Sequence, residues 1–143
     1  MIKKVYKWLQ LASNGDIPKD SIIKMWLDEE LNEFDEAKKS NDINQKNNAI
    51  IDALWITLNL AFYNGLTIKD LEKESKAVFK SNMSKFCKTE KEAIKSCKMY
   101  ANGTHPNKLG VTIETYYLKV KDIYVIRKKN DNKILKSYLF QDC

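Results

Sequence analysis

The sequence predicts a mainly α-helical protein, a four-helix bundle followed by a small antiparallel β-hairpin or meander. Apolar residues recur every three or four positions through four segments before residue 86, as they do on the buried faces of helices. After residue 111, β-branched and aromatic residues gather in short runs separated by turn residues. A chain of 143 residues can bury the core of one domain. We therefore expect residues 1–86 to form the bundle, and residues 87–143 to add a short helix and the hairpin to the same domain.

Four helices account for the predicted bundle. Their expected ranges are 2–13, 20–40, 43–63 and 67–83. The breaks between them are the turn-forming segments Ser13-Asn14-Gly15, Asn41-Asp42 and Asn64-Gly65. Asp20 or Ser21 is expected to cap the second helix, and Thr67 the fourth.

Each of these helices has apolar residues that we expect to point into the bundle. In the first helix they are Val5, Trp8, Leu9 and Leu11; in the second, Ile23, Trp26, Leu27, Leu31 and Phe34; in the fourth, Ile68, Leu71, Ala77, Val78 and Phe79. The third helix is apolar on nearly all sides after Asn48, which predicts a central buried helix. One four-helix core of this size covers such a helix only in part, so we expect a homodimer or a larger assembly.

The C-terminal part is expected to combine a short helix with two or three strands. Thr89 and Glu92 form a capping box, which predicts a helix from there to about Tyr100. The expected strands are 112–120, 123–127 and 134–140, with turns at Lys121-Asp122 and Asn130-Asp131-Asn132.

Charge is unevenly distributed along the chain. Residues 1–72 hold 9 lysines and 12 acids, a net charge of −3, whereas residues 73–143 hold 16 basic residues and 7 acids, a net charge of +9. A basic C-terminal half indicates an anionic partner, either nucleic acid or a phosphorylated small molecule. A lysine-rich surface that is merely solvated is the alternative interpretation.

The sequence favours a cytoplasmic protein. No apolar run reaches the ~20 residues that a membrane-spanning helix needs, and the N-terminal segment lacks the apolar core and cleavage site of a signal peptide. Cys87, Cys97 and Cys143 are odd in number and match no metal-binding spacing, so we expect reduced thiols.

Acidic residues of the second predicted helix form the most distinctive motif. Glu29, Glu30 and Glu33 lie within one turn and share a face, and carboxylate oxygens are the ligands that Mg²⁺ prefers. The next helix should complete such a site. Its matching positions carry neutral amides, Gln45 and Asn48, with Asp52 one turn further on.

Several segments together resemble one protein family. They are Glu29-Glu30-Leu31-Asn32-Glu33, Asp52-Ala53-Leu54-Trp55, Ser81-Asn82-Met83-Ser84-Lys85-Phe86, Cys87-Lys88-Thr89-Glu90-Lys91-Glu92-Ala93, Tyr124-Val125-Ile126-Arg127-Lys128-Lys129 and Asp131-Asn132-Lys133-Ile134-Leu135-Lys136-Ser137. The chain resembles the MazG-like, all-α nucleoside triphosphate pyrophosphohydrolases, in the form common in phages and prophages. The likeness covers most of the chain and is weakest at residues 1–20 and 101–112.

The resemblance implies a dimeric or tetrameric four-helix protein that cleaves a nucleoside triphosphate to monophosphate and pyrophosphate with Mg²⁺. Family members hold the metal with an EExxE motif on one helix and an ExxD motif on the next. Glu29, Glu30 and Glu33 match the first motif. The second motif falls on Gln45 and Asn48, where this sequence departs from the pattern, while Asp52 matches a further acidic position of the phage branch.

The two amides change the expected chemistry. They remove two negative charges from a site that must hold Mg²⁺ ions, and each charge at close range contributes strongly to that affinity. The same change reduces repulsion of an anionic ligand. We therefore expect a protein that binds or sequesters a nucleotide or a nucleotide-derived signal with little or no hydrolysis. The residues expected to contact this ligand are Gln45, Asn48, Asn82 and Lys85.

Other interpretations stay open. If Gln45 and Asn48 are only drift on a solvated helix turn, the protein is an active Mg²⁺-dependent (d)NTP pyrophosphohydrolase, with Glu30 and Glu33 catalytic and Glu29, Glu30, Glu33 and Asp52 as metal ligands. The acidic face can also be plain solvated surface.

A third interpretation is nucleic-acid binding. Basic residues of the C-terminal part alternate with tyrosines: Lys119, Lys121, Arg127, Lys128, Lys129, Lys133 and Lys136 with Tyr116, Tyr117 and Tyr124. The sequence contains no familiar nucleic-acid-binding module, which disfavours this interpretation.

Overall fold

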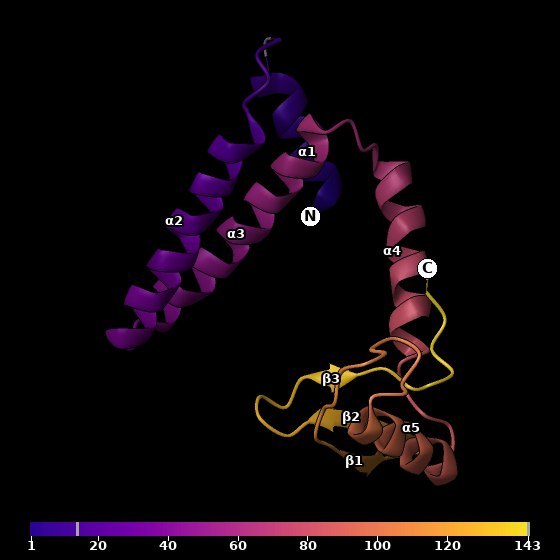
Figure 1. The fold of residues 1–143 in the computed structure, drawn as a ribbon. Helices are drawn as coiled ribbons and strands as arrows, with labels where there is room; N and C mark the ends of the chain where they lie inside the picture. Colours follow the sequence, from indigo (N-terminus) through magenta and orange to yellow (C-terminus); the bar gives the residue numbers. More distant parts are fainter. Residues whose placement is uncertain (14, 143) are drawn as a thin grey trace. The chain divides into compact units, whose positions relative to one another are not determined.

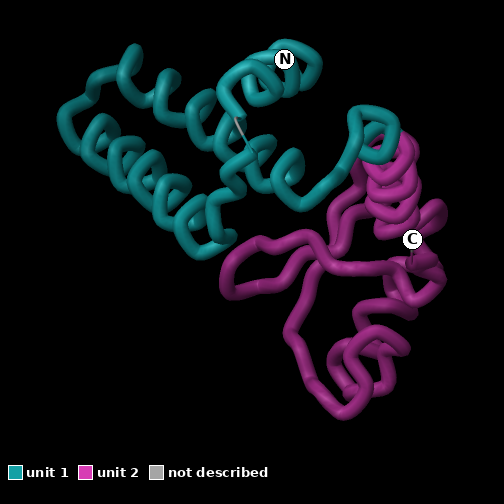
Figure 2. The backbone as a smooth tube through the Cα atoms, turned by 90° about the horizontal axis from the view of Figure 1, so that it is seen from above, with its two compact units in different colours: residues 1–72 teal, residues 73–143 magenta. Residues whose placement is uncertain are grey.

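The computed structural model describes residues 1–13 and 15–142 of the chain. Its helices and strands are α1 (Ile2–Ala12), α2 (Asp20–Lys39), α3 (Ile43–Tyr63), α4 (Ile68–Met83), α5 (Glu90–Asn102), β1 (Thr115–Val120), β2 (Ile123–Lys128) and β3 (Ile134–Leu135) (Figure 1). The chain divides into two compact units, Met1–Glu72 and Lys73–Cys143, here called unit 1 and unit 2 (Figure 2). Asn14, expected in the first turn, and Cys143, expected as a thiol, lie outside the described residues.

Unit 1 is built on the α2–α3 helical hairpin. The two helices pack along their length and reverse direction at Asn41, which has a positive φ of 56° (Figure 1). The Asp42 carboxylate accepts a hydrogen bond from the backbone N–H of Gln45 at 3.0 Å and so caps α3. Because Asp42 caps α3 directly after the turn, the segment between α2 and α3 is short.

Aromatic contacts hold α1 against α3. The Trp8 and Trp55 rings meet edge to face at 5.7 Å, and those of Tyr6 and Phe62 at 5.3 Å. The Tyr6 hydroxyl donates to the carbonyl oxygen of Leu66 at 2.7 Å, which ties α1 to the segment after α3. Val5 and Leu9 are fully buried between these contacts, as their helical spacing predicts.

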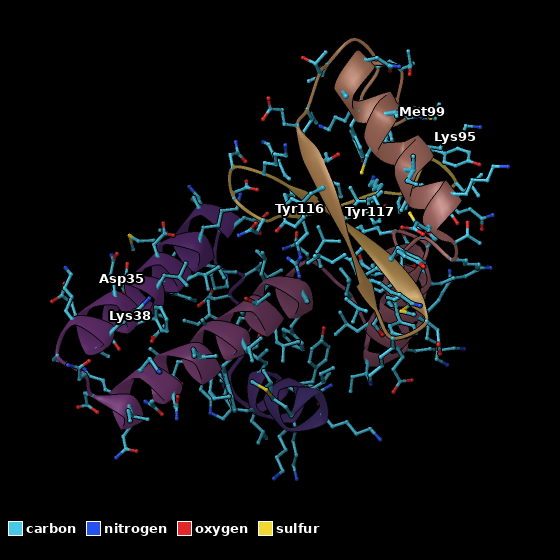
Figure 3. All side chains as sticks on the ribbon, turned by 90° about the horizontal axis from the view of Figure 1, so that it is seen from below. Asp35, Lys38, Lys95, Met99, Tyr116 and Tyr117 are labelled. Atoms are coloured by element: carbon cyan, nitrogen blue, oxygen red, sulfur yellow. The ribbon has the colours of Figure 1, made fainter. Side chains whose placement is uncertain are left out.

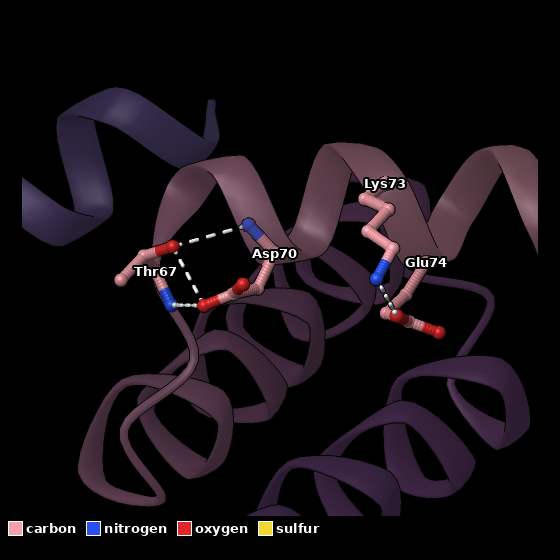
Figure 4. Close-up of polar contacts among 4 residues, drawn as sticks. All are labelled: Thr67, Asp70, Lys73 and Glu74. Atoms are coloured by element: carbon pink, nitrogen blue, oxygen red, sulfur yellow. Dashed lines mark hydrogen bonds and ion pairs between the residues drawn. The ribbon is translucent and has the colours of Figure 1, made fainter.

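The start of α4 shows a reciprocal cap (Figure 4). The backbone N–H of Asp70 donates to the Thr67 hydroxyl at 3.1 Å, and the backbone N–H of Thr67 donates to the Asp70 carboxylate at 2.8 Å. Asp70 thus takes the place of the usual glutamate of a capping box. One turn later Lys73 and Glu74 form an exposed ion pair at 3.9 Å, which contributes little to stability.

Unit 2 packs α5 against a three-stranded antiparallel sheet of order β1-β2-β3. Tyr117 of β1 pairs with Ile126 of β2, which in turn pairs with Leu135 of β3. These residues lie on the face that meets α5, and Ile126 is buried in one cluster with Cys87, Ala93 and Tyr100. Burial raises the pKa of the Cys87 thiol, so this free cysteine behaves as a core residue.

The predicted fold class is confirmed at the level of a mainly helical chain, 57% helix, with a small antiparallel sheet at its C-terminal end. The five helices begin and end within two residues of the expected positions. A four-helix arrangement depends on how α4 lies against unit 1, and the 86/87 division depends on how the two units relate. Both stay predictions.

The third predicted strand is wrong beyond Leu135, because β3 covers Ile134–Leu135 only. The segment that follows bonds to other parts of unit 2: the Ser137 N–H donates to the carbonyl oxygen of Lys85 at 3.0 Å, and the Tyr138 N–H to the Ser96 hydroxyl at 3.0 Å. Side-chain and loop acceptors thus replace a strand partner. The first strand is also shorter than expected and begins at Thr115.

Unit 1 by itself does not bury the third helix on every side, although the sequence predicts a central buried helix. Ile50, Ile51 and Leu54 of α3 are 44–49% exposed. Trp8 and Leu11, expected to point inward, are 50% and 79% exposed. Within unit 1, α1 and α2 cover α3 on two sides, and three helices of this length cannot enclose one that is apolar all round.

Among the described residues, no single helix is long and apolar enough to cross a membrane; α3 and α4 meet that requirement only when taken together as a bent pair.

Candidate functional site

The spacing of residues along α2 places Glu30 on the side of the helix that faces α3. Ile23, Glu30 and Ala37 are spaced by seven residues, close to two turns, so they share one face of α2. Ile23 and Ala37 are both buried, which identifies this face as the one packed in unit 1. Glu30 therefore places a carboxylate on an otherwise apolar stripe.

The same spacing relates three polar residues on α3, namely Gln45, Asp52 and Asn59. Because α2 and α3 run in opposite directions from Asn41, residues equally far from Asn41 lie level with each other. Glu30 and Asp52 are level by this measure, and both are partly buried. The hairpin thus brings together one carboxylate from each helix.

Glu30 is the residue that this arrangement perturbs. Burial is the first cause that raises the pKa of its carboxyl above the ordinary value. The negative charges of Glu33, Asp52 and Glu29, in that order, raise the pKa of Glu30 further. One oxygen, Oε2, is buried and has no hydrogen-bond partner in the described structure. A buried carboxylate without partners is costly, so Glu30 lacks a group that a proton or a ligand can supply.

Asn48 stands beside this pair. Its amide Nδ2–H donates to Oδ2 of Asp52 at 3.1 Å, from one turn earlier on α3. An aspartate at residue 48 would repel Asp52 at this distance, whereas the amide satisfies one of its oxygens. The amide therefore gives one Asp52 oxygen a hydrogen-bond partner within α3.

Gln45 lies further from the acids than the motif spacing suggests. It is exposed in the first turn of α3 and lies level with Ala37, about one turn beyond Glu33. Glu29 and Glu33 are exposed on α2 and act on Glu30 through their charge. The described structure thus groups Glu29, Glu30, Glu33, Asp52 and Asn48, and leaves Gln45 at the edge.

The resemblance implies a magnesium ion, and the carboxylates supply the right kind of ligand. Within residues 1–13 and 15–142, however, no group of three or more His, Cys, Asp or Glu side chains is arranged to hold a metal ion. Asp52 already accepts a bond from an amide. The described side chains of one chain therefore do not fit the implied ion.

Asn59 belongs to this face and was not predicted. Its side chain is 7% exposed, and its amide oxygen has no hydrogen-bond partner in the part of the chain described. It follows Asp52 by two turns on the same side of α3. The signal was available, because Asn59 is the one polar residue in the apolar run Leu58–Phe62.

Asn82 and Lys85 belong to unit 2, at the end of α4. The Lys85 N–H donates to the carbonyl oxygen of Asn82 at 3.2 Å, and the Lys85 carbonyl oxygen accepts from the N–H of Ser137. Lys85 is thus partly buried against the C-terminal segment, and Asn82 is exposed. Their part in a site with the α2–α3 acids stays a prediction.

The chain matches no known family model, no curated protein and no solved structure. The resemblance to the MazG-like family therefore depends on the quoted motifs, and the function drawn from it is a proposal.

Proposed function

We propose that this chain is a phage-type MazG-like protein that binds or sequesters a nucleotide or a nucleotide-derived signal with little or no hydrolysis. The single observation that carries the proposal is the partly buried pair Glu30 and Asp52, beside which the Asn48 amide stands where the family pattern has an acid. Such a site retains polar groups for recognition and lacks the charge that magnesium chemistry needs.

The unsatisfied buried atoms of the α2–α3 face support recognition of a polar ligand. Oε2 of Glu30 and Oδ1 of Asn59 are buried acceptors without partners in the described structure. A nucleobase presents N–H groups that would satisfy the oxygen of Glu30, whereas Asn59 lies two turns further along α3 and would contact another part of the ligand. Each newly satisfied buried group contributes about 1–3 kcal/mol relative to leaving it unpaired. A raised pKa also makes Glu30 easier to protonate, and a neutral carboxyl repels an anionic ligand less.

The proposed assembly follows the same resemblance. In it α4 completes a four-helix bundle, Lys85 contacts a phosphate, Asn82 contacts the base or sugar, and the bundle forms a homodimer or homotetramer in the cytoplasm of a bacterial host. The exposed apolar residues of α3 support association, since a face of this kind is covered in stable proteins.

The alternative is an active Mg²⁺-dependent (d)NTP pyrophosphohydrolase. It is favoured by the charges of Glu33, Asp52 and Glu29, from two helices, which all act on Glu30 and, after burial, raise its pKa. In that case these four residues would be metal ligands, and Glu30 and Glu33 would be the catalytic pair.

Titration calorimetry with a panel of nucleotides, without metal, tests binding. Glu30→Gln with Asn59→Leu should weaken the tightest ligand about tenfold or more, since two buried acceptors are altered. Asp35→Asn is the matched control, because it changes an exposed acid of α2 outside this face and should change affinity less than twofold (Figure 3). Equal effects of both variants, or no binding of any nucleotide, would overturn the proposal.

A second assay separates binding from turnover. Pyrophosphate release is followed from the same nucleotides with Mg²⁺ or Mn²⁺. Release at the rate of a working enzyme, on the order of 1 s⁻¹ or faster, would establish the alternative and exclude sequestration.

A further inference from the structure

A hollow of about 680 Å³ opens in unit 2 beside the end of β2. It is lined by four lysines, Lys108, Lys128, Lys129 and Lys133, and by one acid, Glu114. The net charge of its lining is therefore +3. Lysines gathered around a concave surface raise the local concentration of multivalent anions.

Among the described residues, none of these four lysines forms an ion pair. In residues 1–13 and 15–142 the ion pairs found join Lys39 to Glu36 and Lys73 to Glu74, and none involves the hollow. Asp131 lies in the neighbouring turn, and its carboxylate accepts the backbone N–H of Lys133 at 2.9 Å. That acid is thus engaged in shaping the turn. The ammonium groups of the hollow are available to an external anion.

Part of the lining of the hollow is apolar. Val111, Ile113 and Leu135 contribute to its lining, and the last two are partly buried. The volume falls in the ~300–1,000 Å³ range of small-molecule sites, which combine apolar walls with a few placed polar groups. A ligand that fits must therefore carry both negative charge and an apolar or planar part.

Backbone hydrogen bonds fix the strand side of the hollow. The Lys128 N–H donates to the carbonyl oxygen of Lys133 at 2.9 Å across the β2–β3 turn, and the Lys129 N–H donates to that of Glu114 at 3.1 Å. Three of the four lysines thus stand on a backbone that is already ordered. A ligand has to immobilise only their side chains, which lowers the entropic cost of binding.

The backbone of the fourth lysine, Lys108, is hydrogen bonded to one residue of a buried aromatic pair. The His105 ring stacks on Tyr100 with centroids 3.8 Å apart, and the His105 carbonyl oxygen accepts from the N–H of Lys108 at 2.9 Å. The Gly110 N–H donates to the Gly103 carbonyl oxygen at 2.8 Å and closes the loop. The loop side of the hollow is therefore ordered as well.

A nucleic-acid strand is a poorer fit. Strand-binding surfaces expose aromatic rings for base stacking, but Tyr116 and Tyr117 of β1 are engaged within the chain (Figure 3). Their hydroxyls donate to Asn132 at 2.7 Å and to Glu90 at 2.9 Å. The guanidinium of Arg127 also donates, at 2.8 Å, to the carbonyl oxygen of Asn132. The lysines of the hollow are therefore not accompanied by an aligned set of rings on which bases could stack.

The geometry points to a site in this hollow for a small organic phosphate with at least two phosphoryl groups, which the lysines hold while an apolar or planar part packs against the lining residues Val111, Ile113 and Leu135. Lysine binds phosphate as a point charge, so several lysines suit a cluster of phosphoryl groups. This site is independent of the proposed nucleotide pocket on α2 and α3.

The test is titration calorimetry of the full chain with ATP, tripolyphosphate and adenosine in metal-free buffer. ATP should bind most tightly, tripolyphosphate more weakly, and adenosine least. Lys129→Gln with Lys133→Gln should weaken ATP binding about tenfold, the effect of two lost charged contacts. The matched control, Lys91→Gln with Lys98→Gln, removes the same charge from exposed positions of α5 and should change affinity less than twofold.

Equal weakening by the two lysine pairs would overturn the site in favour of a general charge effect. An oligonucleotide that binds more tightly as it lengthens, and displaces ATP, would overturn it in favour of nucleic acid. Glu30→Gln with Asp52→Asn separates this site from the α2–α3 pocket. If only that variant loses ATP binding, the hollow is overturned and the pocket stands. If only the Lys129 and Lys133 variant loses it, the hollow stands without the pocket.

Discussion

The two units of this chain differ in the polar side chains that they bury and in how these are hydrogen bonded. Unit 2 encloses polar side chains completely: Ser96, His105 and Ser137 are all 0% exposed, and each is hydrogen bonded within the unit. Unit 1 buries small or apolar residues and leaves Leu54 half exposed and the buried oxygen of Glu30 unpaired. In the described residues, unit 2 leaves one buried polar atom, Oγ1 of Thr115, without a hydrogen-bond partner, whereas unit 1 leaves two, Oε2 of Glu30 and Oδ1 of Asn59, which a ligand would satisfy. Both units expose large apolar side chains, such as Leu54 of unit 1 and Phe79 of unit 2.

Core truncation should give the largest difference between the units. Ile126→Ala removes a fully buried side chain from unit 2 and should lower its free energy of unfolding by about 3 kcal/mol. Leu54→Ala, at a half-exposed position of α3, should cost less than about 1 kcal/mol in a monomer. All three tryptophans, Trp8, Trp26 and Trp55, lie in unit 1, so their fluorescence reports on that unit alone.

Urea unfolding of both variants is therefore followed by tryptophan fluorescence and by far-ultraviolet circular dichroism. Ile126→Ala should shift part of the dichroism transition and leave the fluorescence transition in place. If the two signals move together, the units unfold as one and the contrast fails. If Leu54→Ala costs as much as Ile126→Ala at high protein concentration, α3 is covered by a second copy, as proposed.

Restoring charge at the two amides should sharpen the contrast at the pocket. Gln45→Glu with Asn48→Asp adds two carboxylates to α3, and residue 48 then repels Asp52 in place of bonding to it. A divalent ion relieves this repulsion, so Mn²⁺ affinity measured by calorimetry should rise about tenfold or more. Metal-free nucleotide binding should weaken, because negative charge returns to an anion pocket.

Asn44→Asp with Asn47→Asp is the control for that experiment, since it adds the same charge to exposed positions of the same helix. Equal Mn²⁺ affinity in all three proteins would mean that Gln45 and Asn48 lie outside the site. Tight Mn²⁺ binding by the unaltered protein would favour the active enzyme.

Lowering the pH should have the smallest effect on stability, and it should destabilise unit 2. Nδ1 of His105 accepts the Asn107 N–H at 3.2 Å, so Nε2 carries the proton and donates to the Lys136 carbonyl oxygen at 2.9 Å. Burial is the first cause that lowers the pKa of His105 below its ordinary 6.5. The unfolded chain then binds the proton more readily. Stability is therefore complete above pH 6.5 and falls as the pH drops from there toward the lowered pKa.

Thermal unfolding between pH 5 and 7 checks this expectation. His105 is the one histidine of the chain, so His105→Gln should flatten the dependence of the dichroism transition on pH in that window. The fluorescence transition of unit 1 should not change. A dependence that persists in His105→Gln would assign the effect to carboxyl groups.

Local patterns predicted the helices well because their signals are local. Thr67 and Thr89 each cap a helix where the sequence places it. The cap expected at Asp20 or Ser21 is wrong, because α2 begins after Lys19 with no side-chain cap. The predicted end of the third strand was wrong because the segment after Leu135 bonds to Ser96 and Lys85. These residues lie 40 or more positions away, and no local pattern reveals them. The prediction that Trp8 and Leu11 point inward was wrong, because apolar periodicity shows which face can be buried and does not show what is present to cover it.

At the candidate site, spacing within one helix identified Glu29, Glu30 and Glu33 as neighbours, and their effect on Glu30 agrees with that grouping. Matching across two helices was harder. Asp52 lies level with Glu30, but Gln45 lies a turn away from the acids, because the level of two antiparallel helices is set by their turn at Asn41. The orphaned oxygen of Asn59 needed coordinates to be seen.

The bonds that Ser137 makes to Lys85 and Glu92 also bear on how the chain folds as it is made. The Ser137 hydroxyl reaches a partner 45 residues earlier, and the Tyr100 hydroxyl reaches Lys136, 36 residues later. Unit 2 cannot close until the ribosome has added these residues. The α2–α3 hairpin needs only its own two helices and a short turn, so unit 1 can begin to fold while unit 2 is still being synthesised. During that interval the apolar surface of α3 is already present, and nascent chains on neighbouring ribosomes of one messenger can meet through it.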